Sequence, residues 1–174
     1  VEMMYEIDTT YYENTYAKAF VKQFDSEKYS FVGILPNEEK DFSLSSIDID
    51  NLLLSKKEEK VLVGLPKINY QSEIDLKKLL KNYKITEVFG DNPNLTKMTD
   101  DKTKFSKNIQ KVKIGFGEKG TVSTNITKST NDAFTEDEYS KSIILNRPFA
   151  FLIMNNETNE VLFIGKVVSP NETS

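Results

Sequence analysis

The sequence contains no cysteine, no histidine and no tryptophan among its 174 residues. Without cysteine there is no disulfide framework, and the chain carries no information about its redox compartment. Without histidine, Ser-His-Asp and Cys-His catalysis and histidine-ligated zinc are excluded within this chain. A carboxylate-only enzyme would fit the composition, but the acidic residues form no closely spaced pair. Asp48 and Asp50, for example, lie two apart and would occupy different faces of a helix.

Long apolar runs and a strong excess of one charge are also missing. No apolar stretch approaches the roughly 20 residues that a membrane helix needs, and the run 149–154 fits a buried strand instead. The net charge of −4 is spread without long blocks, so the basic surface typical of a nucleic-acid-binding protein is absent. We therefore expect neither a membrane nor a nucleic acid as a partner, and the sequence indicates no cofactor and no metal.

What the chain does contain is enough apolar material for a core. It is 38% hydrophobic and 29% charged, with 11 Phe and 8 Tyr, so general disorder is not expected. The length suits one domain or part of a larger one. The chain begins with Val1 in an apolar segment and shows no signal peptide, so we expect it to be a piece of a longer protein.

The apolar patterning predicts an α+β fold, mostly of antiparallel strands with about three short helices. Strands are predicted at 16–24, 29–35, 61–65, 105–116, 148–154 and 161–168. One helix is predicted near 47–54 after an N-cap at Ser45 or Ser46, and another at 72–82 with Ser72 and Asp75 as a capping box. The last two strands form a predicted hairpin, and their nearly continuous apolar character predicts burial on both faces.

A long polar segment, 120–142, separates two of these predicted strands. Connections of more than about 15 residues without regular structure are uncommon in compact domains, and they are usually functional loops or disordered linkers. Every second residue from Thr121 to Asn131 is small and neutral, while Lys128 and Asp132 fall on the other parity. Because alternate side chains of a strand point to opposite faces, this segment could become a strand with one uncharged face.

Gly115, Gly117 and Gly120 match the G-x-G-x-x-G pattern of dinucleotide-binding proteins. That chemistry needs a helix to begin at the third glycine, with its N-terminus facing the pyrophosphate. A run poor in helix formers, 121–127, follows instead, so a nucleotide-binding enzyme is a minor alternative.

Four asparagines begin an N-x-Thr sequon, the acceptor pattern of N-glycosylation: Asn94, Asn125, Asn156 and Asn171. In a chain so rich in Asn, Ser and Thr, two or three would arise by chance. The sequons alone therefore decide nothing about the compartment.

The C-terminal region closely resembles the end of the serpins, the serine-protease inhibitor family. The matching runs there are Asn146-Arg147-Pro148-Phe149-Ala150-Phe151-Leu152-Ile153 and Leu162-Phe163-Ile164-Gly165-Lys166-Val167-Val168-Ser169-Pro170. Earlier runs resemble serpin sequence in the same order: 1–4, 31–36, Leu65-Pro66-Lys67, Asp75-Leu76-Lys77, Ile85-Thr86-Glu87-Val88-Phe89 and Glu118-Lys119-Gly120-Thr121. By this resemblance, residues 1–174 are the C-terminal part of a single serpin domain, and 118–142 hold the hinge and the reactive-centre loop.

The resemblance implies an inhibitor rather than an enzyme. A serpin offers its exposed loop to a serine protease, becomes cleaved and acylates the protease, and then inserts the cut loop into sheet A. The implied hinge residues are Glu118, Lys119, Gly120, Thr121, Ser123 and Asn125. Lys67 and Glu118 would face each other near the top of sheet A. The implied partners are a target serine protease and the N-terminal half of the same serpin, and the implied location is extracellular or at the cell surface.

The predicted scissile bond joins Phe134 to Thr135. The usual family spacing, counted from Glu118, leads to Phe134, whereas counting back from Asn146 leads nearer to Asp137. An aromatic side chain fills the primary pocket of a chymotrypsin-like protease, while Asp137 would enter it charged and desolvated. Tyr139 is a further candidate, and Phe134 could instead pack the loop onto the body of the protein. A chymotrypsin-like or elastase-like target is expected.

A non-inhibitory serpin, acting as a binding or structural protein, is the main alternative. The hinge of family members usually continues with small residues, mostly alanine. Here the run Val122-Ser123-Thr124-Asn125-Ile126 follows, and a buried Asn125 would need partners for its amide.

Overall fold

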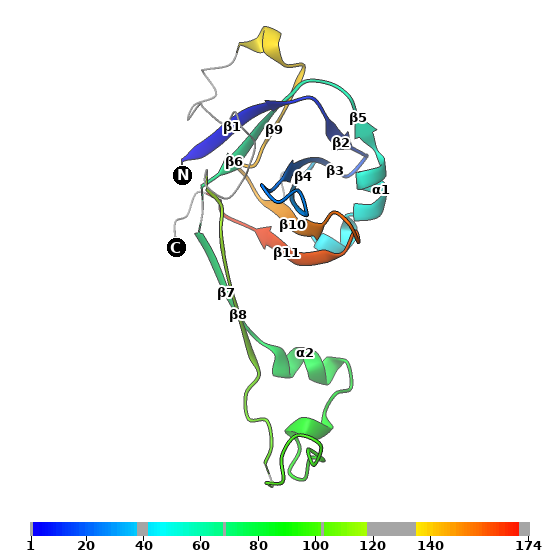
Figure 1. The fold of residues 1–174 in the computed structure, drawn as a ribbon, viewed down its shortest axis with the longest axis vertical. Coiled ribbons are helices and arrows are strands. Elements are labelled where there is room, and N and C mark those ends of the chain that lie inside the picture. The colour runs from blue at the N-terminus through cyan, green and yellow to red at the C-terminus, as the bar shows by residue number, and fades with distance from the viewer. Residues whose placement is uncertain (1, 38–41, 68, 102, 118–134, 171–174) are drawn as a thin grey trace. The chain divides into compact units, whose positions relative to one another are not determined.

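The computed structural model describes residues 2–37, 42–67, 69–101, 103–117 and 135–170. The chain forms two compact units (Figure 1). The larger unit consists of Val1–Ile68 and Gly115–Thr173, and the smaller one spans Asn69–Ile114.

The larger unit contains a six-stranded antiparallel sheet with the order β11-β10-β4-β3-β2-β5. Its strands are β2 (Tyr11–Glu13), β3 (Ala17–Gln23), β4 (Tyr29–Pro36), β5 (Lys56–Lys57), β10 (Phe149–Asn155) and β11 (Val161–Val167). The predicted strands 16–24 and 29–35 correspond to β3 and β4, and the predicted C-terminal hairpin is β10–β11. These predictions are confirmed.

A second sheet in this unit has three strands in the order β1-β6-β9: β1 (Met3–Asp8), β6 (Val61–Pro66) and β9 (Lys141–Ile144). Strand β1 runs antiparallel to β6, whereas β9 runs parallel to it. The predicted strand 61–65 is confirmed as β6. The first two residues of β9 belong to the range 118–142 that the sequence assigned to a loop.

The two faces of the six-stranded sheet bury different residues. On one face, a cluster of small and branched side chains joins the sheet to helix α1 (Ile49–Leu54). Its members are Leu52 of α1, Ile47 before the helix, and Ala17, Ala19, Val32, Ile34, Ala150 and Leu152 of the sheet. The opposite face carries buried phenylalanines, among them Phe20, Phe31 and Phe151. This division follows strand parity, because residues two apart on β3, β4 and β10 point to the same side.

Lys22 links the two sheets. Its Nζ lies 2.8 Å from Oδ2 of Asp8 and 3.0 Å from Oε2 of Glu6, both on β1, while Lys22 itself belongs to β3. The residue is only 9% exposed, so its charge is nearly desolvated and depends on these two carboxylates.

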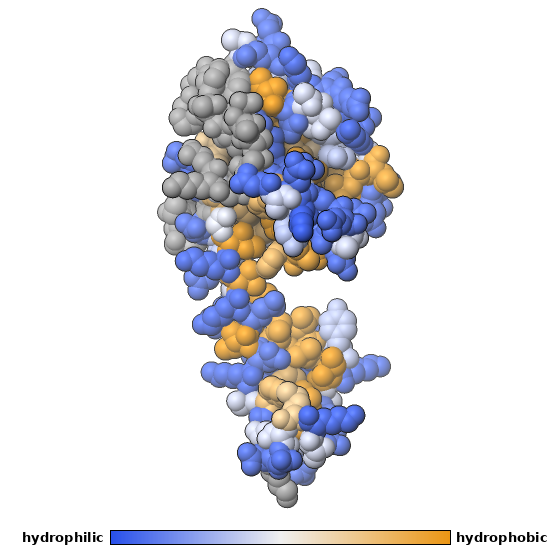
Figure 2. All heavy atoms as spheres, in the orientation of Figure 1, coloured by the Kyte–Doolittle hydropathy of each residue, from blue (hydrophilic) through white to orange (hydrophobic). Residues whose placement is uncertain are grey.

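The smaller unit contains β7 (Asn69–Asp75), helix α2 (Leu76–Asn82), the 3-10 helix η2 (Glu87–Phe89) and β8 (Ile109–Gly115), which pairs with β7. No residue of α2 is buried. Figure 2 shows apolar surface over α2 and the strands beside it. The exposed apolar side chains of this unit include Ile74, Leu79, Ile85, Met98 and Ile109. The unit on its own therefore lacks a closed core.

Three details of the prediction are wrong. Helix α1 begins after Asp48, whose side chain accepts a 3.0 Å hydrogen bond from the Asn51 N–H, and Ser45 and Ser46 lie in the preceding 3-10 helix η1 (Leu44–Ser46). The predicted helix 72–82 starts only at Leu76, because Asp75 is the N-cap and pairing with β8 keeps Ser72 in β7. The predicted strand 105–116 is shorter, since β8 spans Ile109–Gly115.

Burial of the C-terminal hairpin is also only partly as predicted. The first four residues of β10 are buried, but Val161, Leu162, Phe163 and Ile164 of β11 are each about half exposed. Among the described strands, β11 is the edge of its sheet and pairs with β10 alone. Within the described ranges, no helix is long and apolar enough to cross a bilayer.

Candidate functional site

The candidate site is the segment between Gly117 and Thr135 together with the parts of the larger unit that hold its two ends. The predicted hinge residues and Phe134 lie outside the described residues: Glu118, Lys119, Gly120, Thr121, Ser123, Asn125 and Phe134. Thr135, Asp137 and Tyr139 are described. Thr135 and Asp137 are exposed, whereas Tyr139 is half-buried. Of the predicted scissile bond, the structure thus describes only its C-terminal residue.

Directly before the segment, the side chain of Phe116 packs in a cluster of aromatic rings. Its ring centroid lies 5.1 Å from that of Phe31 and 5.1 Å from that of Phe151, both in edge-to-face geometry, with interplanar angles of 70° and 82°. Such pairs contribute about 0.5–1.5 kcal/mol beyond their area burial. Gly165 of β11 lies opposite Phe151, and a Cβ there would come within 2.3 Å of the ring. Only glycine leaves room for this cluster.

After the segment, Thr135 leads into the 3-10 helix η4 (Glu136–Glu138). The Thr135 N–H donates to Oε2 of Glu138 at 2.6 Å, and its hydroxyl lies 3.2 Å from the same oxygen. The Glu138 N–H donates back to the Thr135 carbonyl at 2.9 Å. Thr135 and Glu138 therefore hydrogen-bond to each other across one turn, and Thr135 stays exposed to solvent.

The chain then returns to the core along β9. Both the N–H and the hydroxyl of Ser140 donate to the Lys60 carbonyl at 3.0 Å, and β9 pairs in parallel with β6 from Lys141 opposite Val61 to Ile144 opposite Gly64. Ile143 and Leu145 are completely buried. The C-terminal end of the segment is thus held by the backbone hydrogen bonds of β9 and by burial of the Ile143 side chain.

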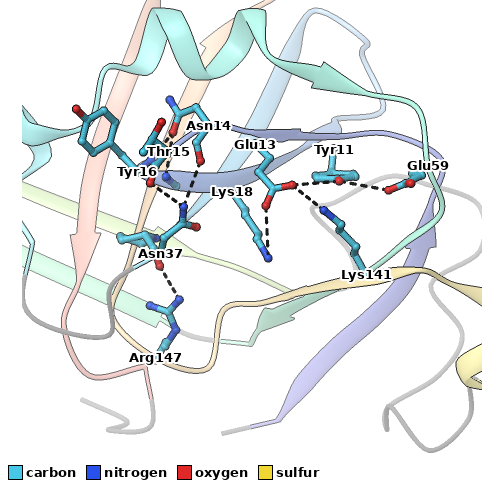
Figure 3. A network of polar contacts seen from close by, with 12 residues as sticks. Tyr11, Glu13, Asn14, Thr15, Tyr16, Lys18, Asn37, Glu59, Lys141 and Arg147 are labelled. Carbon is cyan, nitrogen blue, oxygen red and sulfur yellow. Dashed lines mark hydrogen bonds and ion pairs between the residues drawn. The ribbon is translucent and has the colours of Figure 1, made fainter.

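Lys141 adds a polar anchor at this point (Figure 3). Its Nζ lies 2.9 Å from Oε2 of Glu13 and 5.4 Å from the centroid of the Tyr11 ring. The Tyr11 hydroxyl lies 3.2 Å from Oε2 of Glu13 and 3.3 Å from Oε2 of Glu59. Oε1 of Glu13 lies 3.7 Å from Nζ of Lys18. Lys141 on β9 is thereby connected to β2 of the other sheet.

The pKa shifts in this cluster reflect the same contacts. The hydrogen bond from Lys141 is the main cause that lowers the pKa of Glu13, and burial opposes it. The pKa of Lys141 is raised, first by its contact with the Tyr11 hydroxyl and then by Glu13. Burial raises the pKa of Tyr11, so its hydroxyl stays protonated. The anchor is therefore a charged pair beside a neutral phenol at neutral pH.

Figure 3 also shows the contacts of Arg147, which belongs to the serpin-like run 146–153. The guanidinium donates to the carbonyl of Pro36, at the end of β4. The next residue, Asn37, donates from Nδ2 to the carbonyls of Asn14 and Thr15 at 3.2 and 3.0 Å. These contacts join the chain before β10 to the β2–β3 turn, so this part of the motif is structural.

Lys67 lies directly after β6, and its described partner is Glu2. The Lys67 ammonium forms an ion pair with the Glu2 carboxylate, and the Lys67 N–H donates to the Glu2 carbonyl at 2.8 Å. Glu118, the partner that the sequence predicted, lies outside the described residues. The Lys67–Glu118 pair stays a prediction.

Tyr11, Glu13 and Lys141 are functional candidates that the structure adds to those predicted from the sequence. Residues 11–13 read Tyr-Tyr-Glu, which is too short a run to indicate a cluster, and nothing in the sequence indicates that Lys141 lies beside them. The contact between Lys141 and Glu13 joins residues far apart in the chain, so sheet topology rather than local pattern creates it.

Comparisons with known proteins agree with this fold. Residues 1–170 match the profile of the family described as Serpin (serine protease inhibitor). Plasminogen activator inhibitor 1 of Sus scrofa is 37% identical over 111 residues, which is 63% of this chain and 27% of that protein. Neuroserpin of Homo sapiens is 38% identical over 117 residues, 67% of this chain and 28% of that protein.

Among solved structures, the thermophilic serpin tengpin in its native state matches with a TM-score of 0.76 and 30% identity. The match covers 97% of this chain and 46% of tengpin. The chain belongs to the serpin family, and it spans about half the length of the solved serpins that it matches. The assignment of the hinge and reactive-centre loop to 118–142 stays a prediction.

Proposed function

We propose that this chain is the C-terminal part of a serine-protease inhibitor that acts as a suicide substrate through the loop 118–142. The observation that carries the proposal is the placement of this segment between two anchored ends, Phe116 and Lys141, in a chain that matches the serpin family over residues 1–170. Thr135, the first residue after the proposed bond, is exposed. A protease could therefore reach it from solvent.

In this mechanism the hydroxyl nucleophile of the protease attacks the carbonyl of Phe134, and the bond to Thr135 N breaks as that nitrogen takes up the proton that the hydroxyl loses. Phe134 is left as an acyl group on the protease. The cut loop then enters the large sheet as a new strand. The uncharged parity from Thr121 to Asn131 supports this step, because one face of the new strand would be buried. Each ladder hydrogen bond gained contributes about 1 kcal/mol net, and one strand adds several.

We propose the N-terminal half of the same serpin as the partner that completes the fold. Val161 to Ile164 on β11 are about half exposed, and helix α2 buries none of its residues. Apolar surface of this extent in a serpin fragment is what a missing half would cover. The isolated 174-residue chain should consequently not trap a protease, because its loop lacks a complete sheet to enter.

The target is proposed to be a chymotrypsin-like or elastase-like serine protease, on the basis of the aromatic Phe134. An extracellular or cell-surface location is proposed from the family resemblance. A non-inhibitory serpin is the second candidate. The bulky and polar run Val122 to Ile126, in place of the small residues usual in the hinge, favours it.

The test incubates the full-length serpin that contains this chain with chymotrypsin and, separately, with elastase. We expect a covalent complex that survives SDS and boiling. Cleavage without a complex at every protease ratio would instead identify a non-inhibitory serpin. The isolated chain serves as the negative control.

Thr121→Arg in the full-length protein separates docking from insertion. A charged side chain on the face to be buried would be desolvated when the strand enters, so insertion should slow while cleavage continues. We expect the inhibitor to become a substrate, with the SDS-stable band replaced by the cleaved protein. Thr121→Ser is the matched control, and unchanged trapping by the Arg variant would argue against insertion.

A further inference from the structure

Two of the four sequons lie within the described residues, and the structure treats them differently. Asn94 begins Asn94-Leu95-Thr96 in the smaller unit, and Asn156 begins Asn156-Glu157-Thr158 in the β10–β11 turn of the larger unit. The sequence pattern is the same. The difference lies in what the asparagine side chain and the threonine hydroxyl contact.

The Asn94 amide is open to an incoming group. Asn94 is exposed, and its Nδ2 has no hydrogen-bond partner among the described residues. The Thr96 hydroxyl donates to Oδ1 of Asn94 at 2.8 Å, which fixes the asparagine–threonine geometry within the tripeptide. Asn94 also lines an open depression together with Asp91, Thr103 and Lys104, so there is space beside it for a sugar ring.

The Asn156 amide is occupied at both atoms. Its Oδ1 accepts from the Ser30 hydroxyl at 2.7 Å, and its Nδ2 donates to the Glu27 carbonyl at 2.6 Å. Ser30 is only 3% exposed, so loss of this contact would leave a buried hydroxyl without that partner. The Thr158 hydroxyl is directed to Glu160 at 3.0 Å and not to Asn156.

We propose that Asn94 is an N-glycosylation acceptor of this protein and that Asn156 is not. The donor is a lipid-pyrophosphate-linked oligosaccharide. A bond forms between Nδ2 of Asn94 and C1 of the first sugar, the bond from C1 to the pyrophosphate oxygen breaks, and the amide releases one proton. At Asn156 the same transfer would replace one of the two Nδ2 protons by a sugar, on a nitrogen that lies 2.6 Å from the Glu27 carbonyl and in an amide that is also held by Ser30. The sugar would crowd both contacts. Protein that folds and leaves the cell therefore carries no glycan there.

This inference rests on the proposed extracellular location, because the transfer takes place in the secretory pathway. The full-length protein is expressed with its natural start in eukaryotic cells, and secretion into the medium is scored first. If the protein stays inside the cell, the location proposal fails. A version with an added secretory leader then tests Asn94 on its own.

The secreted protein is deglycosylated enzymatically in heavy-oxygen water, which converts each formerly glycosylated asparagine to a labelled aspartate. Trypsin places the four sequons on separate peptides: 85–97, 120–128, 142–166 and 167–174. We expect the label in 85–97 and none in 142–166. A sample treated without the glycosidase controls for spontaneous deamidation. Secreted protein with an unlabelled Asn94, or with a labelled Asn156, would overturn the proposal.

Matched variants of the hydroxyl sharpen the test. Thr96→Ala should abolish the label at Asn94, and Thr96→Ser, which keeps a hydroxyl, should retain it. Thr158→Ala should leave the labelling pattern unchanged. If Thr96→Ala is still labelled to the same extent as the parent protein, the modification does not follow the sequon and the proposal is wrong.

Discussion

The two ends of the candidate loop are held by different physical means. Upstream, the Phe116 ring packs edge-to-face against the stacked rings of Phe31 and Phe151, in the apolar interior. Downstream, Lys141 reaches Glu13 and Tyr11 in a partly exposed polar cluster. Apolar packing is insensitive to pH, and losing it weakens the whole fold. The polar anchor is local and depends on charge.

The difference fits the proposed mechanism. Once the loop is cut, the upstream part must move while remaining joined to the body, so its root at Phe116 needs a permanent attachment. The downstream part stays with β9, which is already fixed by pairing with β6 and by the buried Ile143 and Leu145. Lys141 therefore reinforces a strand end that other contacts hold as well.

The largest expected effect comes from removing the upstream anchor. Phe116→Ala in the full-length serpin should reduce the free energy of unfolding by about 3–5 kcal/mol, because it deletes a buried ring and leaves a cavity. Phe116→Leu, which keeps most of the volume, should cost less than about 1.5 kcal/mol. Denaturant unfolding measures both. A loss below about 1 kcal/mol for the alanine variant would show that the aromatic cluster does not anchor the chain.

Removing the downstream anchor should have a smaller and more local effect. Lys141→Met keeps the apolar stem but loses the contact with Glu13, and both side chains are partly exposed, 39% and 26%. We expect a loss of about 1 kcal/mol, since partly exposed ion pairs contribute little. Hydrogen exchange of the β9 amides, 141–144, should accelerate while exchange in β4 and β10 is unchanged.

Lys56→Met is the control for this variant. Lys56 pairs with Glu58 in a more exposed position, with side chains 50% and 79% exposed. Its replacement should leave β9 exchange unaltered. Equal effects of the two substitutions would mean that the cluster around Glu13 adds nothing beyond a surface ion pair.

The smallest expected effect is a pH dependence of the downstream anchor. The pKa of Glu13 is lowered by Lys141, so its stabilisation is fully present above the ordinary glutamate pKa of about 4.3 and is lost as the pH falls through the lower, folded-state value. The stability gap between the parent protein and Glu13→Gln should be constant near neutral pH and shrink below about pH 4. Denaturant midpoints at low salt measure it. A gap that widens on acidification would contradict the assignment.

Most of the fold followed from local pattern. The hairpin β10–β11 and the pair β3–β4 were predictable because long apolar runs are separated by short polar turns. The helix boundaries were less predictable than the strands. Ser72 and Asp75 are both residue types that cap helices, and only the pairing of β7 with β8 selects Asp75. The exposure of β11 could not be predicted from composition, because an apolar edge strand has the same sequence as a central one.

The site was less predictable than the fold. The prediction of a scissile bond between Phe134 and Thr135 rests on the family resemblance and on the chemistry of an aromatic side chain, not on residue spacing alone. The anchors depend on contacts between distant segments. Phe116, directly after β8, meets Phe31 of β4 and Phe151 of the neighbouring strand β10, and Lys141 of one sheet meets Glu13 of the other.

The most direct test of the central claim is the mass of the species formed when the full-length serpin meets chymotrypsin. The proposed mechanism predicts a covalent adduct of the protease with the serpin chain ending at Phe134. The peptide that begins at Thr135 contains the paired strands β9, β10 and β11, so it should separate from the adduct only under denaturing conditions. A peptide that begins at Ser140 would move the bond to Tyr139. Complete cleavage within 118–142 with no adduct at any protease ratio would contradict the account, because the loop would then be a substrate and not a trap.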